Sequence, residues 1–370
     1  MWKKADNHLN HQNIFLRSPL INLITGETRH NRSEVTIAAI DIGSLTIRLA
    51  IAALGTTAGN LQLLLRRRAI THLGQGLVPT GYLAPVPMAR SLAVLNEFSR
   101  DLRQFKVAAN RAVATQAVRQ ARNRRTFLDQ LYQQTGLNVE VLDPAQEAGL
   151  SLAGVLSVLT PAAEDNQPLL VFDVGGGSTE WALVLPGQQA IFASLPLGAS
   201  TLTQRWLVND PPTKAELLAL RAEIQHQLRQ LPETFLSNPR LRGRWRLVGT
   251  AGTVTTLASI SLGMTDYAPQ RINNLVISRA TVDRLTGQLV TRSEAERSQL
   301  PGLEPGKAGV IVAGALIIQE ILALYQRASL VVIDAGLLEG VLLQLAEEIS
   351  ANQNSDTIDH PQSPRLINSY

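Results

Sequence analysis

The chain has 370 residues, of which 45% are hydrophobic and 17% are charged, so it is large and apolar enough for two packed domains. Its formal net charge of +4 favours an anionic partner, but does not distinguish a nucleic acid, a lipid headgroup and a polyphosphate. The absence of cysteine excludes disulfides, thiolate nucleophiles and cysteine-ligated metals.

The two ends of the chain have polar compositions. Residues 1–34 contain no secretory signal and are predicted to be a flexible extension, and residues 350–370, rich in Asn, Ser, Asp and Pro, are predicted to be a disordered tail. The longest apolar stretch, Ala308 to Ile318, is too short to span a bilayer and predicts a buried helix. We therefore expect a soluble cytoplasmic protein with no membrane partner.

Strands and helices alternate between these ends, which predicts an α/β architecture. In the first half, strands are expected at 36–40, 47–53, 111–114 and 139–142, with helices over 85–105, from 116 and from 144. In the second half, strands are expected at 169–172, 181–185, 245–248 and 330–333, with helices over 213–235, after 253 and over 336–348. We divide the ordered part into a first domain, 35–150, and a second domain, 151–349. Whether the last helix of the second domain packs back on the first domain is left open.

One pattern occurs twice: a β-rich run, Asp-x-Gly, a turn with hydroxyl side chains, and a second β-rich run. It begins at Asp41 and again at Asp173. A single copy would usually be only a hairpin, but two matched copies indicate an internal duplication that faces a central cleft.

Glycine-rich turns allow backbone N–H groups to converge on an anion, and hydroxyl groups add further donors. The predicted phosphate-binding residues of the two turns are Gly43, Ser44, Thr46, Gly175, Gly176, Gly177, Ser178 and Thr179. Carboxylates beside a phosphate require a cation, and Mg²⁺ favours carboxylate, water and phosphate oxygens. Asp41, Asp173 and Glu180 are therefore predicted to be direct or water-mediated ligands of Mg²⁺ or Mn²⁺.

A third phosphate-binding segment is predicted at Gly252 and Thr253, because Gly-Thr-Ala-Gly-Thr follows a strand and opens a helix. Helix capping alone would also explain this segment. The chain has no Gly-Lys-Ser/Thr triplet and no suitably placed Gly-x-Gly-x-x-Gly, which argues against P-loop and Rossmann folds.

Two further side chains are candidates for catalysis. If Asp143 caps the helix that Pro144 opens, Gln146 completes a capping box and Glu147 is not needed for the cap. Glu147 is then free to act as a general base, although first-turn glutamates usually only interact with the helix dipole. Arg119 lies in the first turn after Thr115. It is interpreted either as a residue that binds a phosphate group through its guanidinium or as a solvated helix residue.

The sequence resembles the exopolyphosphatase and guanosine pentaphosphate phosphohydrolase family, Ppx/GppA, over roughly Val35 to Leu345. The matching blocks are AAIDIGSLTIRL, ATQAVRQARN, LLVFDVGGGSTE, SLPLGAS, VGTAGTVTTLA and LPGLEPGKAGVIVAGA. This resemblance implies a duplicated actin-like, ribonuclease-H-like fold with an interdomain active site. It implies Glu147 as the catalytic base, Arg119 as the phosphate-gripping arginine, and the three carboxylates as metal ligands.

The sequence departs from the family pattern at several positions. Leu45 replaces a usual Asn, Gln146 and Gly149 replace a usual Glu and Arg, Asn273 and Asn274 replace a common His-Gly pair, and Leu338 replaces an Arg. The predicted base and metal positions keep their carboxylates. These departures bear on affinity, rate and substrate choice more than on the type of reaction.

From these features we expect a metal-dependent hydrolase that removes terminal orthophosphate from linear polyphosphate. The alternatives are a guanosine pentaphosphate phosphohydrolase, a non-catalytic polyphosphate or alarmone sensor, and an actin-like ATPase or sugar kinase. The clusters Arg66 to Arg68 and Arg122 to Arg125 are candidate tracks for a polyanion. No specific nucleic-acid partner is expected, and the oligomeric state is left open, a homodimer being one option.

Overall fold

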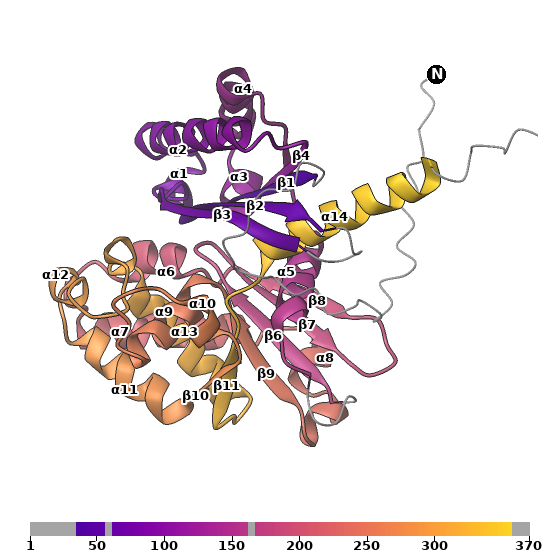
Figure 1. Ribbon diagram of the computed structural model, residues 1–370. Helices are drawn as coiled ribbons and strands as arrows, with labels where there is room; N and C mark the ends of the chain where they lie inside the picture. The colour runs from indigo at the N-terminus through magenta and orange to yellow at the C-terminus, as the bar shows by residue number, and fades with distance from the viewer. Residues whose placement is uncertain (1–34, 56–60, 162–166, 357–370) are drawn as a thin grey trace, which may run out of the picture.

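The computed structural model describes residues 35–55, 61–161 and 167–356, and the predicted extension at 1–34 and the end of the tail lie outside them. These residues form two lobes, each built on one sheet (Figure 1). The sheet of lobe I has the order β3-β2-β1-β4-β5, with β1 Thr36–Ile42, β2 Thr46–Leu54, β3 Leu61–Ile70, β4 Ala109–Ala114 and β5 Val139–Val141. The sheet of lobe II has the order β10-β11-β9-β6-β7-β8, with β6 Leu169–Val174, β7 Thr179–Val184, β8 Ile191–Leu195, β9 Arg246–Thr250, β10 Leu275–Ser278 and β11 Ser329–Val332.

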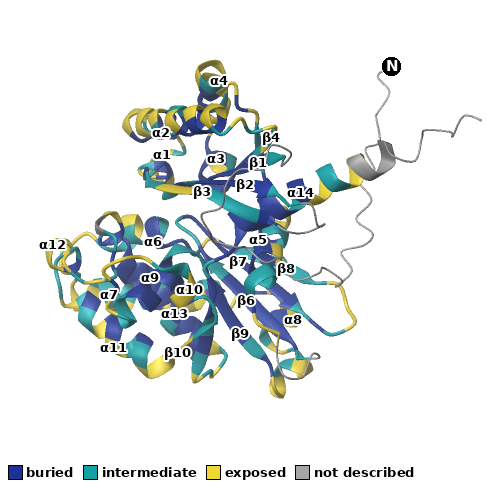
Figure 2. Ribbon diagram, viewed as in Figure 1, coloured by how far each residue is buried: buried dark blue, intermediate teal, exposed yellow. Residues whose placement is uncertain are grey.

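Helices cover both faces of each sheet, which explains why the central strands are almost continuously apolar (Figure 2). The helices of lobe I are α1 Leu77–Thr80, α2 Pro85–Gln104, α3 Gln116–Gln120 and α4 Arg124–Thr135. Those that follow are α5 Pro144–Val158, α6 Ala199–Trp206, α7 Lys214–Leu228, α8 Glu233–Leu236, α9 Ala251–Ser261, α10 Pro269–Ile272, α11 Arg279–Val290, α12 Glu294–Arg297, α13 Ile311–Leu324 and α14 Leu337–Asp356. Short 3₁₀ helices span Pro239–Arg242 and Pro305–Lys307.

The two lobes repeat one hairpin in detail. In lobe I, Asp41 pairs with Arg48 across β1 and β2, and the Gly43 N–H donates to the Thr46 carbonyl at 3.0 Å. In lobe II, Asp173 pairs with Glu180, and Gly175 donates to Ser178 at 3.0 Å. The first strand of each hairpin also pairs in parallel with a later strand of its own lobe, β4 or β9. The duplication predicted from the two Asp-x-Gly turns is therefore confirmed.

Two expected elements differ in extent from the structure, and strands β3, β8 and β10 were not expected. The predicted helix over 213–235 breaks into α7 and α8, because Pro232 cannot continue a helix. Of the strands that were missed, β3 carries the run of three arginines. Helix α14 continues to Asp356, so the predicted disordered tail is wrong over 350–356. The buried helix expected near Ala308 is confirmed as α13.

The chain crosses between the lobes at α5 and at α14. Helix α5 packs on the sheet of lobe II through β6, β7 and β8, whereas α14 packs on β1, β2 and β4 of lobe I. Figure 1 shows α14 running from lobe II along the sheet of lobe I. The domain boundary drawn from the sequence, at residue 150, falls inside α5.

Helices α5 and α14 cross with their backbones in contact. A Cβ atom at Gly340 would lie 1.8 Å from the Leu150 carbonyl oxygen, and one at Gly154 would lie 2.0 Å from that of Gly336. Such distances cannot be relieved by a side-chain rotation, so the helices would have to separate. The glycines therefore fix how the two lobes are joined.

We predict that Gly340→Ala lowers the free energy of unfolding by about 1–3 kcal/mol, the usual effect of overpacking. Denaturant unfolding would measure it. The matched control is Gly287→Ala at an exposed position of α11, where a Cβ meets nothing within 4 Å, and alanine should stabilise by about 0.5–1 kcal/mol. Equal stabilisation by both substitutions would contradict this account of the crossing.

Candidate active site

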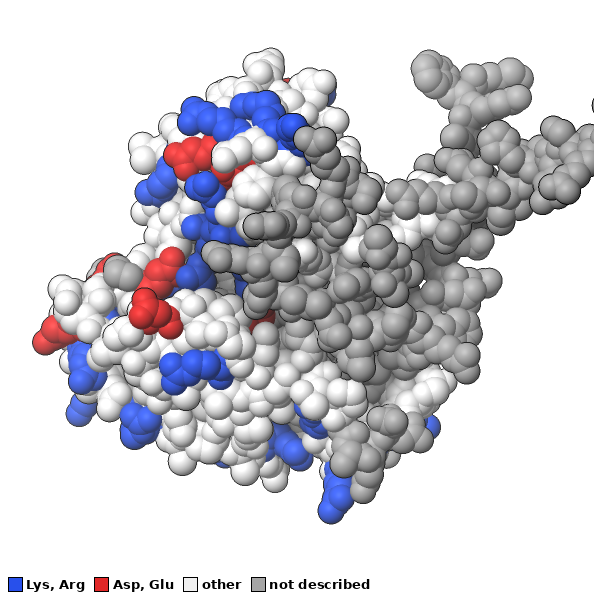
Figure 3. All heavy atoms as spheres, viewed as in Figure 1, with Lys and Arg blue, Asp and Glu red and all other residues white. Residues whose placement is uncertain are grey.

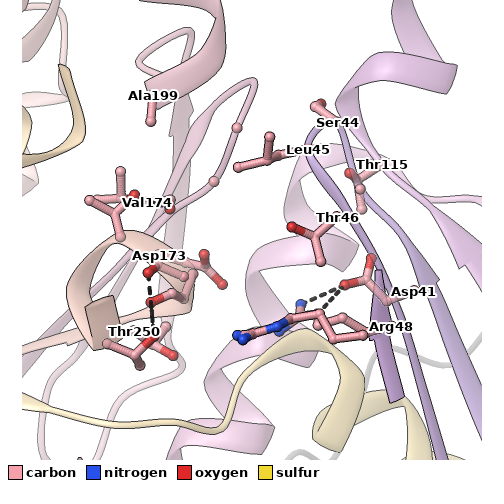
Figure 4. A pocket seen from close by; sticks show the side chains of 18 of the residues that line it. Asp41, Ser44, Leu45, Thr46, Arg48, Thr115, Asp173, Val174, Ala199 and Thr250 are labelled. Atoms are coloured by element: carbon pink, nitrogen blue, oxygen red, sulfur yellow. Dashed lines mark hydrogen bonds and ion pairs between the residues drawn. The ribbon is translucent and has the colours of Figure 1, made fainter. Parts of the chain in front are cut away.

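A cavity of about 370 Å³ lies between the lobes. It is lined by both hairpin turns, by β3, and by the starts of α3, α5 and α9. Figure 4 shows side chains of the two hairpins facing each other across this space. All of the predicted site residues line the cavity except Arg119 and Thr179.

The glycines of the two turns bring the lobes together. A Cβ at Gly177 would lie 1.9 Å from Gln116 Oε1 and 2.7 Å from Ser44 Oγ, and one at Gly176 would lie 3.0 Å from Leu45 Cβ. Ser44 donates to Gln116 at 3.0 Å. Glycine is thus required at 177 for close contact between the turns, in addition to any role toward a ligand.

Asp41 is neutralised by a cation from its own hairpin. Arg48 Nε and Nη2 both donate to Asp41 Oδ2, at 2.8 and 2.5 Å. Burial opposes the charge of Arg48, but Asp41 and Glu339 raise its pKa overall. Asp41 Oδ1 is buried and has no hydrogen-bond partner. One oxygen of this carboxylate therefore remains available to a ligand in the cleft.

Glu147 is held at the start of α5 by the predicted capping box. Asp143 accepts from the N–H groups of Ala145 and Gln146, and Gln146 Oε1 accepts from the Asp143 N–H at 2.9 Å. Glu147 is therefore not used by the cap, as predicted. It is 8% exposed, and Arg119 Nη1 donates to its Oε2 at 2.9 Å.

Burial raises the pKa of Glu147 to about 7, against the lowering effect of Arg119 and with Asp173 and Asp41 adding to the rise. A carboxylate with this pKa is well matched to accept a proton near neutral pH. Arg119 also donates to the Leu142 carbonyl at 2.6 Å, so in this structure it orients Glu147 and lies outside the cavity lining.

The carboxylates of lobe II have hydroxyl partners. Ser151, one turn after Glu147 on α5, donates to Asp173 Oδ2 at 2.6 Å, and Ser194 donates to Glu180 Oε1 at 3.0 Å. Burial raises the pKa of Asp173 and raises that of Glu180 well above its ordinary value, with Glu147 and Asp173 contributing to the latter. Thr179, in contrast, is fully buried and its hydroxyl donates to the Leu197 carbonyl.

Helix α9 opens at the cavity without a side-chain cap. Its N-cap residue, Thr250, donates instead to the Ala335 carbonyl at 2.7 Å, and Ala251 has a φ of 68°, which is strained for a residue with a Cβ. Gly252 and Thr253 follow in the first turn and line the cavity. The uncapped N–H groups of this turn are suited to an anion.

The carboxylates of the cleft are candidate ligands of a divalent cation. Over residues 35–55, 61–161 and 167–356, no three His, Cys, Asp or Glu side chains lie close enough to form a metal centre by themselves. Mg²⁺ does not need such a cage, because it keeps waters and binds through one or two carboxylates together with substrate phosphates. The unpartnered Asp41 Oδ1 and the neighbouring Asp173 fit that manner of binding.

The sequence prediction missed several residues that line the cavity. Arg48 could have been predicted, because it lies two residues after Thr46 on β2 and its side chain therefore points to the same face of the sheet. Lys307 lies in the matching block LPGLEPGKAGVIVAGA but was not selected as a site residue, and Tyr267 had no local signal, since a loop distant in the chain carries it into the cleft.

The two arginine clusters differ. Arg66, Arg67 and Arg68 line the cavity, whereas Arg122 stacks on Tyr82 and Arg125 is 93% exposed on α4. Figure 3 shows basic side chains running down lobe I toward the boundary between the lobes, with acidic side chains beside them.

A duplicated α/β fold with paired glycine turns and a buried carboxylate in the cleft defines a class of phosphate-transferring proteins. A family model described as the Ppx/GppA phosphatase family matches residues 53–349. The chain belongs to that family, and the predicted actin-like fold and the expectation of a hydrolase of phosphoric anhydride bonds are confirmed.

Individual relatives agree with this assignment. The chain is 34% identical to exopolyphosphatase 2 of Mycobacterium tuberculosis over 323 residues, covering 84% of this chain and 98% of that one. A crystal structure of the Aquifex aeolicus family member has 32% identity and a TM-score of 0.69, with 86% and 99% of the two chains covered. An exopolyphosphatase structure from Cytophaga hutchinsonii has 26% identity and a TM-score of 0.76, covering 85% and 98%. No helix among the described residues is long and apolar enough to cross a membrane.

Proposed function

We propose that this protein is a metal-dependent exopolyphosphatase, which removes terminal orthophosphate from linear polyphosphate. The observation that carries the proposal is Glu147, a buried carboxylate that lines the cleft, is oriented by Arg119 and has a pKa of about 7. A base of this kind can activate water only if the phosphate is bound beside it. The two turns and the uncapped start of α9 provide that binding.

In the proposed reaction, Glu147 takes a proton from water as the water oxygen attacks the terminal phosphorus. The bond from that phosphorus to the bridging oxygen breaks, and the shortened chain leaves with the bridging oxygen. Backbone N–H groups of the turns and Arg48 stabilise the negative charge of the transferred group. A bound Mg²⁺ or Mn²⁺, held by Asp41 and Asp173 with Glu180 nearby, would neutralise phosphate charge.

The choice of polyphosphate over guanosine pentaphosphate is supported by the cleft itself. Arg66 and Arg68 line it beyond the turns, so several successive phosphates of one chain would meet cations. The named exopolyphosphatase relatives favour the same choice. Guanosine pentaphosphate remains the second candidate, because the family description includes both types of enzyme.

We predict a higher kcat/KM for polyphosphate than for guanosine pentaphosphate, and little turnover of ATP. Orthophosphate release at one fixed ionic strength measures all three, and affinity for polyphosphate should fall as salt screens the arginines. A higher kcat/KM for guanosine pentaphosphate would reverse the substrate assignment, and tight binding without release of phosphate would favour a sensor.

A further inference from the structure

The cleft is closed at one end by contacts between its two hairpin turns. A Cβ atom at Gly176 of lobe II would lie 3.0 Å from Leu45 Cβ of lobe I. One at Gly177 would lie 1.9 Å from Gln116 Oε1, at the start of α3. All four residues line the cavity. Distances this short leave no space between the tips of the turns for a phosphate group to pass.

Backbone hydrogen bonds hold both tips in place. The Leu45 carbonyl accepts from the N–H groups of Thr71 and His72, at 2.9 and 3.0 Å. The Gly176 carbonyl accepts from the Ser200 N–H at 2.9 Å, which ties the tip of the lobe II turn to α6. A chain that pushed either tip aside would have to break these bonds. The closed end is therefore a fixed part of the cleft.

The side chain at the centre of this closed end is apolar. Figure 4 shows Leu45 pointing from the hairpin of lobe I toward Val174 and Ala199 of lobe II, and all three residues line the cavity. None of these side chains can donate a hydrogen bond. Burial of a phosphate anion against such groups is strongly unfavourable, because its charge would lose water and gain no donor. A phosphate chain consequently has no favourable site beyond Leu45.

We propose that Leu45 and Gln116, closed against the turn of lobe II, form an end wall that admits only the terminus of a phosphate chain to the two turns. An interior phosphate has a neighbour on each side, and one of the two would have to pass between the tips. The inference rests on the proposed function in that the ligand is a linear phosphate chain. The end wall makes Leu45 and Gln116 specificity-determining residues, because it restricts hydrolysis to the last phosphate.

The experiment compares the binding of two imido-linked phosphate chains of equal length, whose P–N–P bonds resist hydrolysis. One chain has free ends and the other carries a benzyl ester at both ends. By calorimetry, the wild-type protein should bind the esterified chain roughly 10- to 100-fold more weakly, the value of the charge-assisted hydrogen bonds that a free terminus makes with the turns. In the double variant Leu45→Ala, Gln116→Ala, the two affinities should differ by only a few fold.

Matched controls make the same two changes away from the cleft. Leu218→Ala and Gln130→Ala, at exposed positions of α7 and α4, should keep the wild-type ratio of affinities. Because the ratio compares two ligands of one protein, a general loss of stability does not change it. Equal binding of both chains by the wild-type protein, or an unchanged ratio in the double variant, would overturn the end wall. If the double variant does not fold, an unchanged ratio in both single variants would do so.

The products of turnover give a second readout. When water attacks an interior phosphorus, the P–O–P bond breaks and leaves two shorter chains. The wild-type protein should release only orthophosphate from a long polyphosphate, whereas the double variant should also yield chains of intermediate length on electrophoresis. Orthophosphate as the sole product of an active double variant would contradict the end wall.

The end wall and the proposed function can fail separately, because the binding ratio is measured without turnover. If no phosphate is released from polyphosphate but the ratio changes as expected, the end wall stands and the exopolyphosphatase activity does not. If phosphate is released and the ratio in the double variant stays at its wild-type value, only the end wall is refuted.

Discussion

Replacing Glu147 with Gln is expected to lower kcat by a factor of about 10² to 10⁴, the usual contribution of a positioned general base. Glutamine keeps the size of the side chain and can still accept from Arg119 through its amide oxygen. It cannot take a proton from water, so the chemical step is impaired while the phosphate contacts of the turns remain. Orthophosphate release under saturating polyphosphate measures the loss.

Binding and stability separate this effect from damage to the fold. The affinity of the variant for a non-hydrolysable imido-linked chain should remain within a few fold of wild type, since Glu147 is not part of the capping box. Glu97→Gln, on the exposed face of α2, is the matched control and should have wild-type turnover. Near-normal kcat in the Glu147 variant would remove the residue from the mechanism.

Local sequence signals predicted the parts of the site that depend on local structure. The Asp143 cap, the first position of Pro144 and the freedom of Glu147 follow from neighbouring residues, and the structure has them as expected. The two hairpins were predicted for the same reason, because a turn of this kind is specified within about ten residues.

Contacts between distant segments could not be predicted in this way. The sequence presented Arg66 to Arg68 only as a basic cluster, and the missed strand β3 determines that Arg66 and Arg68 pair with Asp334 and Glu304 of distant segments. Arg119, for which the family resemblance implies a phosphate contact, donates in this structure to Glu147 of α5 and to the Leu142 carbonyl. These pairings arise from the packing of segments that are distant in the chain.

The same limit applies to the charge balance of the cleft. The sequence suggested that Asp41 needs a divalent cation to tolerate phosphate, whereas the structure shows that Arg48 already neutralises one of its oxygens. In lobe II, Glu180 occupies the position equivalent to Arg48, so the two hairpins carry opposite charges at this matched position. We therefore expect a metal ion to bind chiefly through the carboxylate oxygens that do not contact Arg48.

Removal of divalent cations is expected to abolish phosphate release, and added Mg²⁺ or Mn²⁺ should restore it. The structural reason is that Asp41 Oδ1 is buried without a hydrogen-bond partner, and that Asp173 and Glu180, whose pKa values burial raises, line the same cavity. One or two of these carboxylates are enough to hold Mg²⁺, and the phosphates of the substrate would complete its coordination.

Asp173→Asn and Glu180→Gln should each raise the metal concentration needed for half-maximal activity by about tenfold or more, given that even the partners of metal ligands contribute that much. Binding of Mn²⁺, followed by its electron paramagnetic resonance signal in the presence of an imido-linked chain, gives a readout independent of turnover. Asp129→Asn, which changes an exposed carboxylate on α4, should leave the Mn²⁺ affinity unchanged. If both cleft variants bind Mn²⁺ as the wild type does, their carboxylates shape the hairpins and the cation, if one is required, is held elsewhere.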